Sequence, residues 1–182
     1  MSENYSDKVK CIIKQGQIAK SKLGIMGPTG PRGQIGPTGP TGPTSETVFG
    51  RKYDNTANTI ALQANTAMNI PLGNNGPYSG VTVETQDTLT IVEEGNYKID
   101  YFFSGSTNTA GNITVEVKQN NASIGSTTIV KSLTPNNNTD FSGSSINALA
   151  AGDKINLIIK SSAAATITKS AGTNAFLNIF KL

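Results

Sequence analysis

The stretch NYKIDYFFSGS, residues 96–106, decides the fold of the C-terminal part of the chain. Its apolar and polar side chains alternate, and successive side chains of a β-strand point to opposite faces. One face carries Tyr97, Ile99, Tyr101 and Phe103, and the other carries Lys98, Asp100 and Phe102. The alternation predicts a strand with one buried face, while Phe102 adds an apolar residue to the face expected to be polar.

Short runs of the same kind lie on both sides of this stretch, separated by clusters of Asn, Gly, Ser and Pro. Such runs are typical of strands joined by turns, and no helix-length segment with helical periodicity lies between them. The expected strands cover residues 47–54, 59–63, 67–72, 80–85, 88–92, 96–106, 112–119, 123–130, 141–150, 154–160, 165–169 and 174–182. Their number and spacing predict an all-β head over residues 45–182, a β-sandwich of jelly-roll type.

Upstream of the head, residues 24–44 read GIMGPTGPRGQIGPTGPTGPT, with glycine at every third position. A flexible linker needs glycine but not in register, whereas only glycine fits at the crowded axis of a collagen triple helix. Proline follows five of the seven glycines and pre-sets the extended φ of that helix. The repeat predicts a collagen-like stalk about 60–65 Å long, whose axis residues are Gly24, Gly27, Gly30, Gly33, Gly36, Gly39 and Gly42.

Seven triplets form a short stalk, and aligning three chains costs ordering and loop-closure entropy. A neighbouring domain that holds three chains in register would offset this cost. We therefore expect the head to form a homotrimer, preceded by the triple helix and by a flexible N-terminal tail, residues 1–23.

Two further expected strands of the head carry apolar residues on both faces. Ile158 opposes the apolar face of 154–160, and Phe176 and Phe180 oppose the Leu177 face of 174–182. Such a strand needs a second cover, which is either a loop or another subunit, and the stalk favours a threefold subunit interface. The expected interface residues are Tyr101, Phe103, Ile158, Phe176 and Phe180, although the interface and core faces can be exchanged.

The tail contains one apolar cluster, KVKCIIK, within an otherwise polar segment. The alternation of Val9, Cys11 and Ile13 favours a short strand over a helix. The tail is either disordered or an anchoring peptide that adds a strand to a partner's sheet edge through Val9, Cys11, Ile12 and Ile13. Cys11 is the only cysteine, which leaves a free thiol or a disulfide between chains.

Net charge argues against nucleic acid as a partner. The total is +3, made of +3 in the tail, +1 from Arg32 in the stalk and −1 in residues 45–182. The head therefore lacks a basic binding face. No apolar run reaches the length needed for membrane insertion, and the start of the chain lacks the apolar core of a secretory signal peptide.

Catalytic chemistry also finds little support, and we expect no enzyme activity. The chain has no histidine, its one cysteine lies on the tail, and its glycines form no phosphate-binding loop. Its carboxylates are too scattered for a calcium loop. We predict no catalytic residues, no cofactor and no metal.

The head resembles the jelly rolls of the tumour-necrosis-factor-like family, which includes the globular heads of the first complement component. The segment TIVEEGNYKIDYFF resembles that family's Gly-x-Tyr-x-apolar-x-Tyr strand through Gly95, Tyr97, Ile99 and Tyr101. The segment LAAGDKINLII resembles its late Gly-Asp turn, and NAFLNIFKL resembles its terminal strand. The resemblance covers most of residues 45–182 and implies the same sandwich.

Stalk and head together resemble the exosporium collagen-like glycoproteins of the BclA type, whose Gly-Pro-Thr triplets match GPTGPTGPT. Such proteins form projections on bacterial spores, are anchored by their N-termini and need no export signal. The resemblance implies candidate O-glycan sites at Thr29, Thr38, Thr41 and Thr44. The stalk is shorter than that family's, and the tail does not match its leader.

The expected function is that of a structural surface-fibre protein on a spore, in the exosporium or at the tip of a spore appendage. The tail would attach to a spore-surface or appendage protein. An alternative is an adhesin whose loops 73–79, 106–111 and 133–140 contact a host protein or glycan. A component of a phage tail fibre, another extracellular surface fibre, is also open.

Overall fold

The computed structural model describes residues 10, 27–34, 36, 47–83 and 86–182 of the chain. The chain divides into two units, residues 1–43 and 44–182, and each is described by itself.

In the N-terminal unit, residues 27–34 and 36 are exposed and have no regular secondary structure. Lys10 has a helical backbone, so the strand expected around it is not found at this residue. The other predicted residues of the tail, stalk and adjoining segment lie outside the described residues: Val9, Cys11, Ile12, Ile13, Gly24, Thr38, Gly39, Thr41, Gly42 and Thr44.

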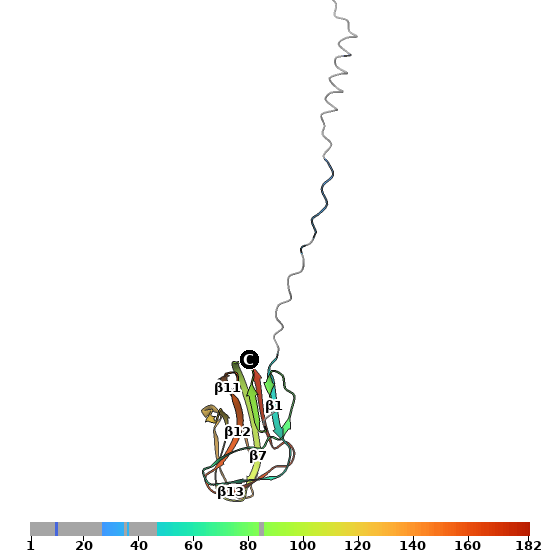
Figure 1. The fold of residues 1–182 in the computed structure, drawn as a ribbon. Coiled ribbons are helices and arrows are strands. Elements are labelled where there is room, and N and C mark those ends of the chain that lie inside the picture. The colour runs from blue at the N-terminus through green and yellow to red at the C-terminus, as the bar shows by residue number, and fades with distance from the viewer. Residues whose placement is uncertain (1–9, 11–26, 35, 37–46, 84–85) are drawn as a thin grey trace, which may run out of the picture. The chain divides into compact units, whose positions relative to one another are not determined.

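The head consists of β-strands, drawn in Figure 1. The strands are β1 (Phe49–Asp54), β2 (Thr59–Leu62), β3 (Ala67–Asn69), β4 (Asn74–Asn75), β5 (Val81–Thr82), β6 (Thr88–Ile91), β7 (Gly95–Thr107), β8 (Gly111–Gln119), β9 (Ala122–Ser123), β10 (Ile129–Leu133), β11 (Thr139–Leu149), β12 (Lys154–Ser161), β13 (Ala165–Lys169) and β14 (Ala175–Lys181). A single 3₁₀ turn, η1 (Gly125–Thr127), is the helical element of the described head. The all-β fold predicted from the sequence is confirmed.

The strands form two antiparallel sheets. The first sheet has the order β2-β13-β7-β14-β1-β4, with β11 paired to β7, and the second has the order β10-β8-β12-β6-β5. In the second sheet β3 also pairs with β12, and β9 pairs with β8. The 13-residue β7 is the centre of the first sheet, because it contacts β11, β13 and β14 along its length.

The core lies between the sheets and follows the alternation seen in the sequence. On β7, Tyr97, Ile99, Tyr101 and Phe103 are at most 2% exposed and belong to one continuous apolar cluster. Leu177 and Ile179 of β14 join the same cluster, as do Ile155, Leu157 and Ile159 of β12. Burial of these side chains provides the main driving force for folding the sandwich.

Tyr101 occupies its core position because two other elements leave room for it and bind it. A Cβ on Gly143 of β11 would lie only 2.5 Å from the Tyr101 hydroxyl oxygen. The hydroxyl donates a hydrogen bond to the backbone carbonyl of Thr127. A glycine on the neighbouring strand is thus required for the close approach of the tyrosine ring.

The main difference from the predicted elements lies at residues 123–130, which do not form one strand. They form β9, the turn η1 and the first residues of β10 instead. The buried Thr127 hydroxyl accepts a hydrogen bond from the Val117 N–H at 2.8 Å and donates to the Ile124 carbonyl at 2.7 Å. These side-chain bonds replace ladder bonds and fold the segment into a turn.

Candidate subunit interface

The outer face of the first sheet, which points away from the core, carries three rows of side chains across β1, β14, β7 and β11. The strand register aligns Tyr53, Phe176, Phe102 and Ser142 in one row; Arg51, Asn178, Asp100 and Ser144 in the next; and Phe49, Phe180, Lys98 and Ile146 in the third. We call these twelve residues the outer face. Aromatic residues of three strands flank a polar middle row.

Aromatic side chains of β1, β7 and β14 contact one another or Arg51 on the outer face. The rings of Phe102 and Phe176 are stacked, with centroids 5.6 Å apart and planes 20° apart. The Arg51 guanidinium carbon lies 5.3 Å from the Tyr53 ring centroid and 5.4 Å from that of Phe176. Aromatic residues and arginine, which make such contacts, are enriched at protein interfaces.

Apolar residues remain exposed at the edge of the outer face. Phe180 is 43% exposed and Ile146 is 65% exposed, whereas Phe49, Tyr53, Phe102 and Phe176 are half-buried. The outer side of an antiparallel sheet is usually polar when it faces water. This cluster of exposed and half-buried apolar side chains is therefore a candidate interaction site.

Two polar atoms of the middle row have no partner although they are buried. Arg51 Nε and Asn178 Oδ1 make no hydrogen bond to the described residues. Both residues line a hollow of about 240 Å³, together with Phe49, Gly50, Pro77 and Phe180. Unpaired buried donors and acceptors are costly, so this hollow is suited to receive a polar group from outside the single chain.

The structure separates the five predicted interface residues into two groups. Phe176 and Phe180 lie on the outer face, as the expected interface requires. Tyr101 and Phe103 are 2% and 1% exposed in the core of the single chain. They have no surface left for a partner. For these two residues the face expected at the interface is therefore the core face.

Ile158 was expected at the interface as well, but it is 3% exposed within the second sheet. Its strand β12 lies between β8 and β6, away from the outer face of the first sheet. The sequence interpretation missed Phe49 and Tyr53 as members of the outer face. The sequence interpretation noted Phe102 only as an apolar residue on a face expected to be polar. That unexpected residue was the one local sign that this face is apolar.

The loops considered for recognition fall into two places. Loops 106–111 and 133–140 meet, because the Asn136 N–H donates to the Thr107 carbonyl at 2.7 Å. Loop 73–79 instead adjoins β1 through bonds from Gly76 to Arg51, 2.9 Å, and between Ser79 and Phe49, 2.9 Å. This loop therefore borders the outer face.

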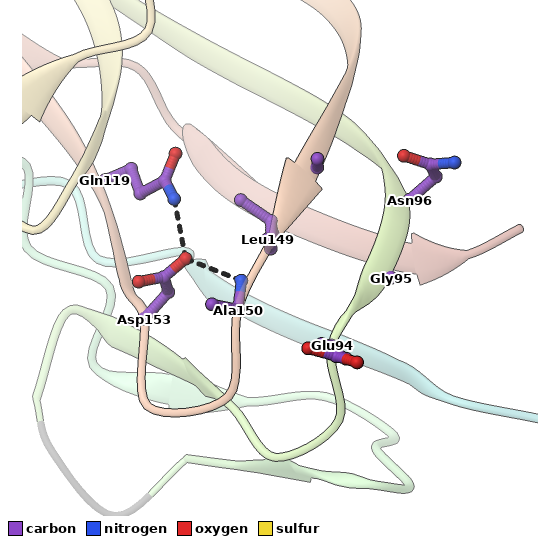
Figure 2. Close-up of a pocket in the computed structure, with 8 residues that line it drawn as sticks. Glu94, Gly95, Asn96, Gln119, Leu149, Ala150 and Asp153 are labelled. Carbon is purple, nitrogen blue, oxygen red and sulfur yellow. Dashed lines mark hydrogen bonds between the residues drawn. The ribbon is translucent and has the colours of Figure 1, made fainter.

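A second hollow, of about 550 Å³, lies where β7 begins and β11 ends (Figure 2). Asp153 lies in this hollow and accepts hydrogen bonds from Gln119 and Asn120, both 2.5 Å, and from the Ala150 N–H at 2.8 Å. The Ala150 N–H contributes most to holding the pKa of Asp153 below its usual value; the two side-chain amides help, and burial opposes them. Both oxygens of the carboxylate accept hydrogen bonds that stabilise the turn between β11 and β12.

The depressed pKa of Asp153 predicts a pH dependence of stability. Its contribution is complete above the unfolded-state value, about 3.9, and disappears as the pH falls through the lower folded-state value. Asp153→Asn should therefore be less stable than the wild type at neutral pH, and the difference should shrink below about pH 4. Urea midpoints measured across this range test the expectation, and a difference that stays constant with pH would contradict it.

Within the described part of the chain, no group of three His, Cys, Asp or Glu side chains is placed to hold a metal ion. In the same residues, no helix is long and apolar enough to cross a membrane.

Comparison with protein families matches residues 51–182 to the family described as the BclA C-terminal domain. No curated protein sequence matches the chain.

Several solved structures of animal proteins are similar to the head. Eiger TNF from S. frugiperda has a TM-score of 0.58 at 12% identity, covering 75% of this chain and 92% of that one. Murine APRIL has 0.53 at 14% identity, covering 75% and 100%. The globular domain of zebrafish complement 1qA has 0.52 at 15% identity, covering 74% and 97%. At these identities the likeness concerns the fold, a jelly roll of the tumour-necrosis-factor and complement-head type.

Proposed function

Because this chain belongs to the family of the BclA C-terminal domain, we propose that it is a structural surface-fibre protein of a bacterial spore. Three heads associate through their outer faces and hold three chains in register. The collagen-like stalk then winds as an effectively intramolecular event, and the tail attaches the fibre to a spore-surface or appendage protein.

The observation that carries the proposal is the outer face. It combines stacked aromatic rings with two buried polar atoms that lack partners in the single chain. A second and third copy would cover the rings and offer hydrogen bonds to Arg51 and Asn178. The free energy gained is about 25 cal/mol per Å² of apolar area removed from water.

The glycines of the described part of the stalk fit the proposed triple helix. A Cβ built on Gly27, Gly30, Gly33 or Gly36 would meet no atom of the described residues within 4 Å. No contact among the described residues therefore requires glycine at these four positions. The close approach of two other chains around a common axis does require it.

Thr29 is exposed in the described stalk and is the candidate O-glycan site that the structure describes. We extend the same proposal to Thr38, Thr41 and Thr44, the other threonines of the stalk's third positions. We propose that the tail anchors the fibre through Val9, Cys11, Ile12 and Ile13.

The molar mass of the full-length chain in solution tests the proposal. Multi-angle light scattering should give three times the chain mass at micromolar concentration. Antibodies against the head should label the surface of intact spores. A single-subunit mass would contradict the trimer, and a trimer without spore labelling would place the fibre on another surface.

Gly33→Ala is expected to remove the stalk's melting transition or shift it to clearly lower temperature, because a methyl group cannot fit at the triple-helix axis. The head trimer should be unchanged. Circular dichroism at increasing temperature measures the transition, and Gln34→Ala in the same triplet is the matched control. A stalk that melts identically in all three proteins would argue against collagen geometry.

A further inference from the structure

A lysine and an aspartate face each other inside the core of the head. Lys169 ends β13 and Asp54 ends β1, and the Lys169 amine donates to Asp54 Oδ2. Their side chains are 0% and 5% exposed. Lysine and aspartate are rarely buried this fully, and neither residue belongs to the outer face.

The hydrogen-bond count around the amine does not suit an ammonium ion. An ammonium carries three donor hydrogens, yet among the described residues the Lys169 amine has Asp54 as its one hydrogen-bond partner. Unpaired donors on a buried charge are costly. Removing two ions from water also carries a desolvation penalty that their mutual attraction often fails to repay.

Neighbouring groups hold the carboxyl and both partner segments in place. The Thr56 N–H donates to Asp54 Oδ1 at 3.1 Å, so one oxygen of the carboxyl is held while the other faces the amine. Asn174 donates its backbone N–H to the Asp54 carbonyl at 3.0 Å and its side-chain amide to the Ser170 carbonyl at 3.0 Å. It thus joins both partner segments, and its buried Oδ1 has no hydrogen-bond partner.

We propose that Lys169 and Asp54 condense into an intramolecular isopeptide bond. The Lys169 nitrogen forms a bond to Asp54 Cγ, and the bond from Cγ to Oδ2 breaks. Two hydrogens of the ammonium pass to Oδ2, which leaves as water, and the third remains as the amide N–H. No oxidant, reductant or further reactant is consumed, and Oδ1 remains as the amide carbonyl.

The surroundings favour the attack of the amine on the carboxyl carbon. Burial lowers the pKa of Lys169, which makes the neutral, nucleophilic amine accessible. The Thr56 N–H stabilises the negative charge that develops on Oδ1 during the attack. The fixed arrangement of both groups within the folded core replaces a bimolecular encounter.

The link would join strands that are not neighbours. β13 and β1 lie in the same sheet with β7 and β14 between them, and the two residues are 115 positions apart. A covalent bond there closes most of the head into one loop and restricts the unfolded chain. This inference does not depend on the trimer or on the spore location.

The mass of the denatured full-length chain tests the bond. Protein incubated until its mass is constant should weigh less than its sequence by one water molecule. Proteolysis should release a branched peptide that contains Asp54 and Lys169. A chain of full mass, or a water loss that maps to other residues, would overturn the proposal.

Two lysine variants provide matched controls. Lys169→Met removes the nucleophile and should restore the full sequence mass. Lys52→Met removes another buried lysine, 3% exposed, whose amine donates to Asn75 Oδ1 at 2.9 Å and has no place in the bond. This variant should keep the water loss. If either variant fails to fold, the wild-type mass and its peptide map still decide the question.

Discussion

Replacing Phe102 with aspartate is expected to turn trimers of the full-length chain into monomers. Phe102 lies on the outer face and stacks on Phe176 at 5.6 Å, away from the core. Aspartate removes this aromatic anchor and places a charge where three subunits would exclude water. Truncating an interface hot-spot residue costs about 2 kcal/mol or more, and the proposed trimer would repeat the loss at each of its subunit contacts.

Light scattering on the variant measures the effect, with circular dichroism as the check that the β-structure remains. Val130→Asp is the matched control, because Val130 is 57% exposed on β10 of the second sheet. It introduces the same charge on the second sheet, outside the twelve residues of the outer face, and should leave the trimer intact. A trimer that survives Phe102→Asp would place the interface on another surface of the head.

Replacing the next residue, Phe103, with alanine is expected to destabilise the head itself by about 3–5 kcal/mol. Phe103 is 1% exposed, and its ring centroid lies 6.3 Å from that of Phe141 inside the core. Alanine leaves a cavity that the tightly packed sandwich fills only in part. Urea unfolding at fixed protein concentration measures the loss.

Phe102→Ala provides the matched comparison, because it makes the same substitution on the opposite side of the same strand. This variant should lower the molar mass measured in solution and make the urea unfolding midpoint depend on protein concentration. The stability of the isolated subunit should change little. Equal losses of subunit stability in both variants would contradict the division between core and outer face.

Much of the fold could be predicted because a strand with one buried face alternates apolar and polar residues, and this pattern is visible in a short stretch of sequence. The expected strand at 96–106 corresponds to β7, Gly95–Thr107, and the expected strand at 165–169 matches β13 in both bounds. Alternation placed Tyr101 and Phe103 on one side and Phe102 on the other. It could not say which side meets the core, because both sides carry aromatic residues.

The remaining features depend on contacts between distant segments. The outer face exists because β1 aligns Tyr53 with Phe176, and β7 aligns Phe102 with the same residue. Strand register of this kind is set by the whole sandwich and leaves no local signal. The Lys169 and Asp54 pair is similar, since each charge alone resembles an ordinary polar end of a strand.

The two ends of the head segment lie side by side, since the Lys181 N–H donates to the Val48 carbonyl at 2.9 Å. Loops 106–111 and 133–140 follow the opposite end of β7, which at about 3.3 Å per residue is roughly 40 Å away. A foreign epitope inserted at residues 134–138 would therefore be displayed far from where upstream sequence joins. A fusion at the C-terminus would crowd that junction instead, so the loop is the better site for engineering cargo.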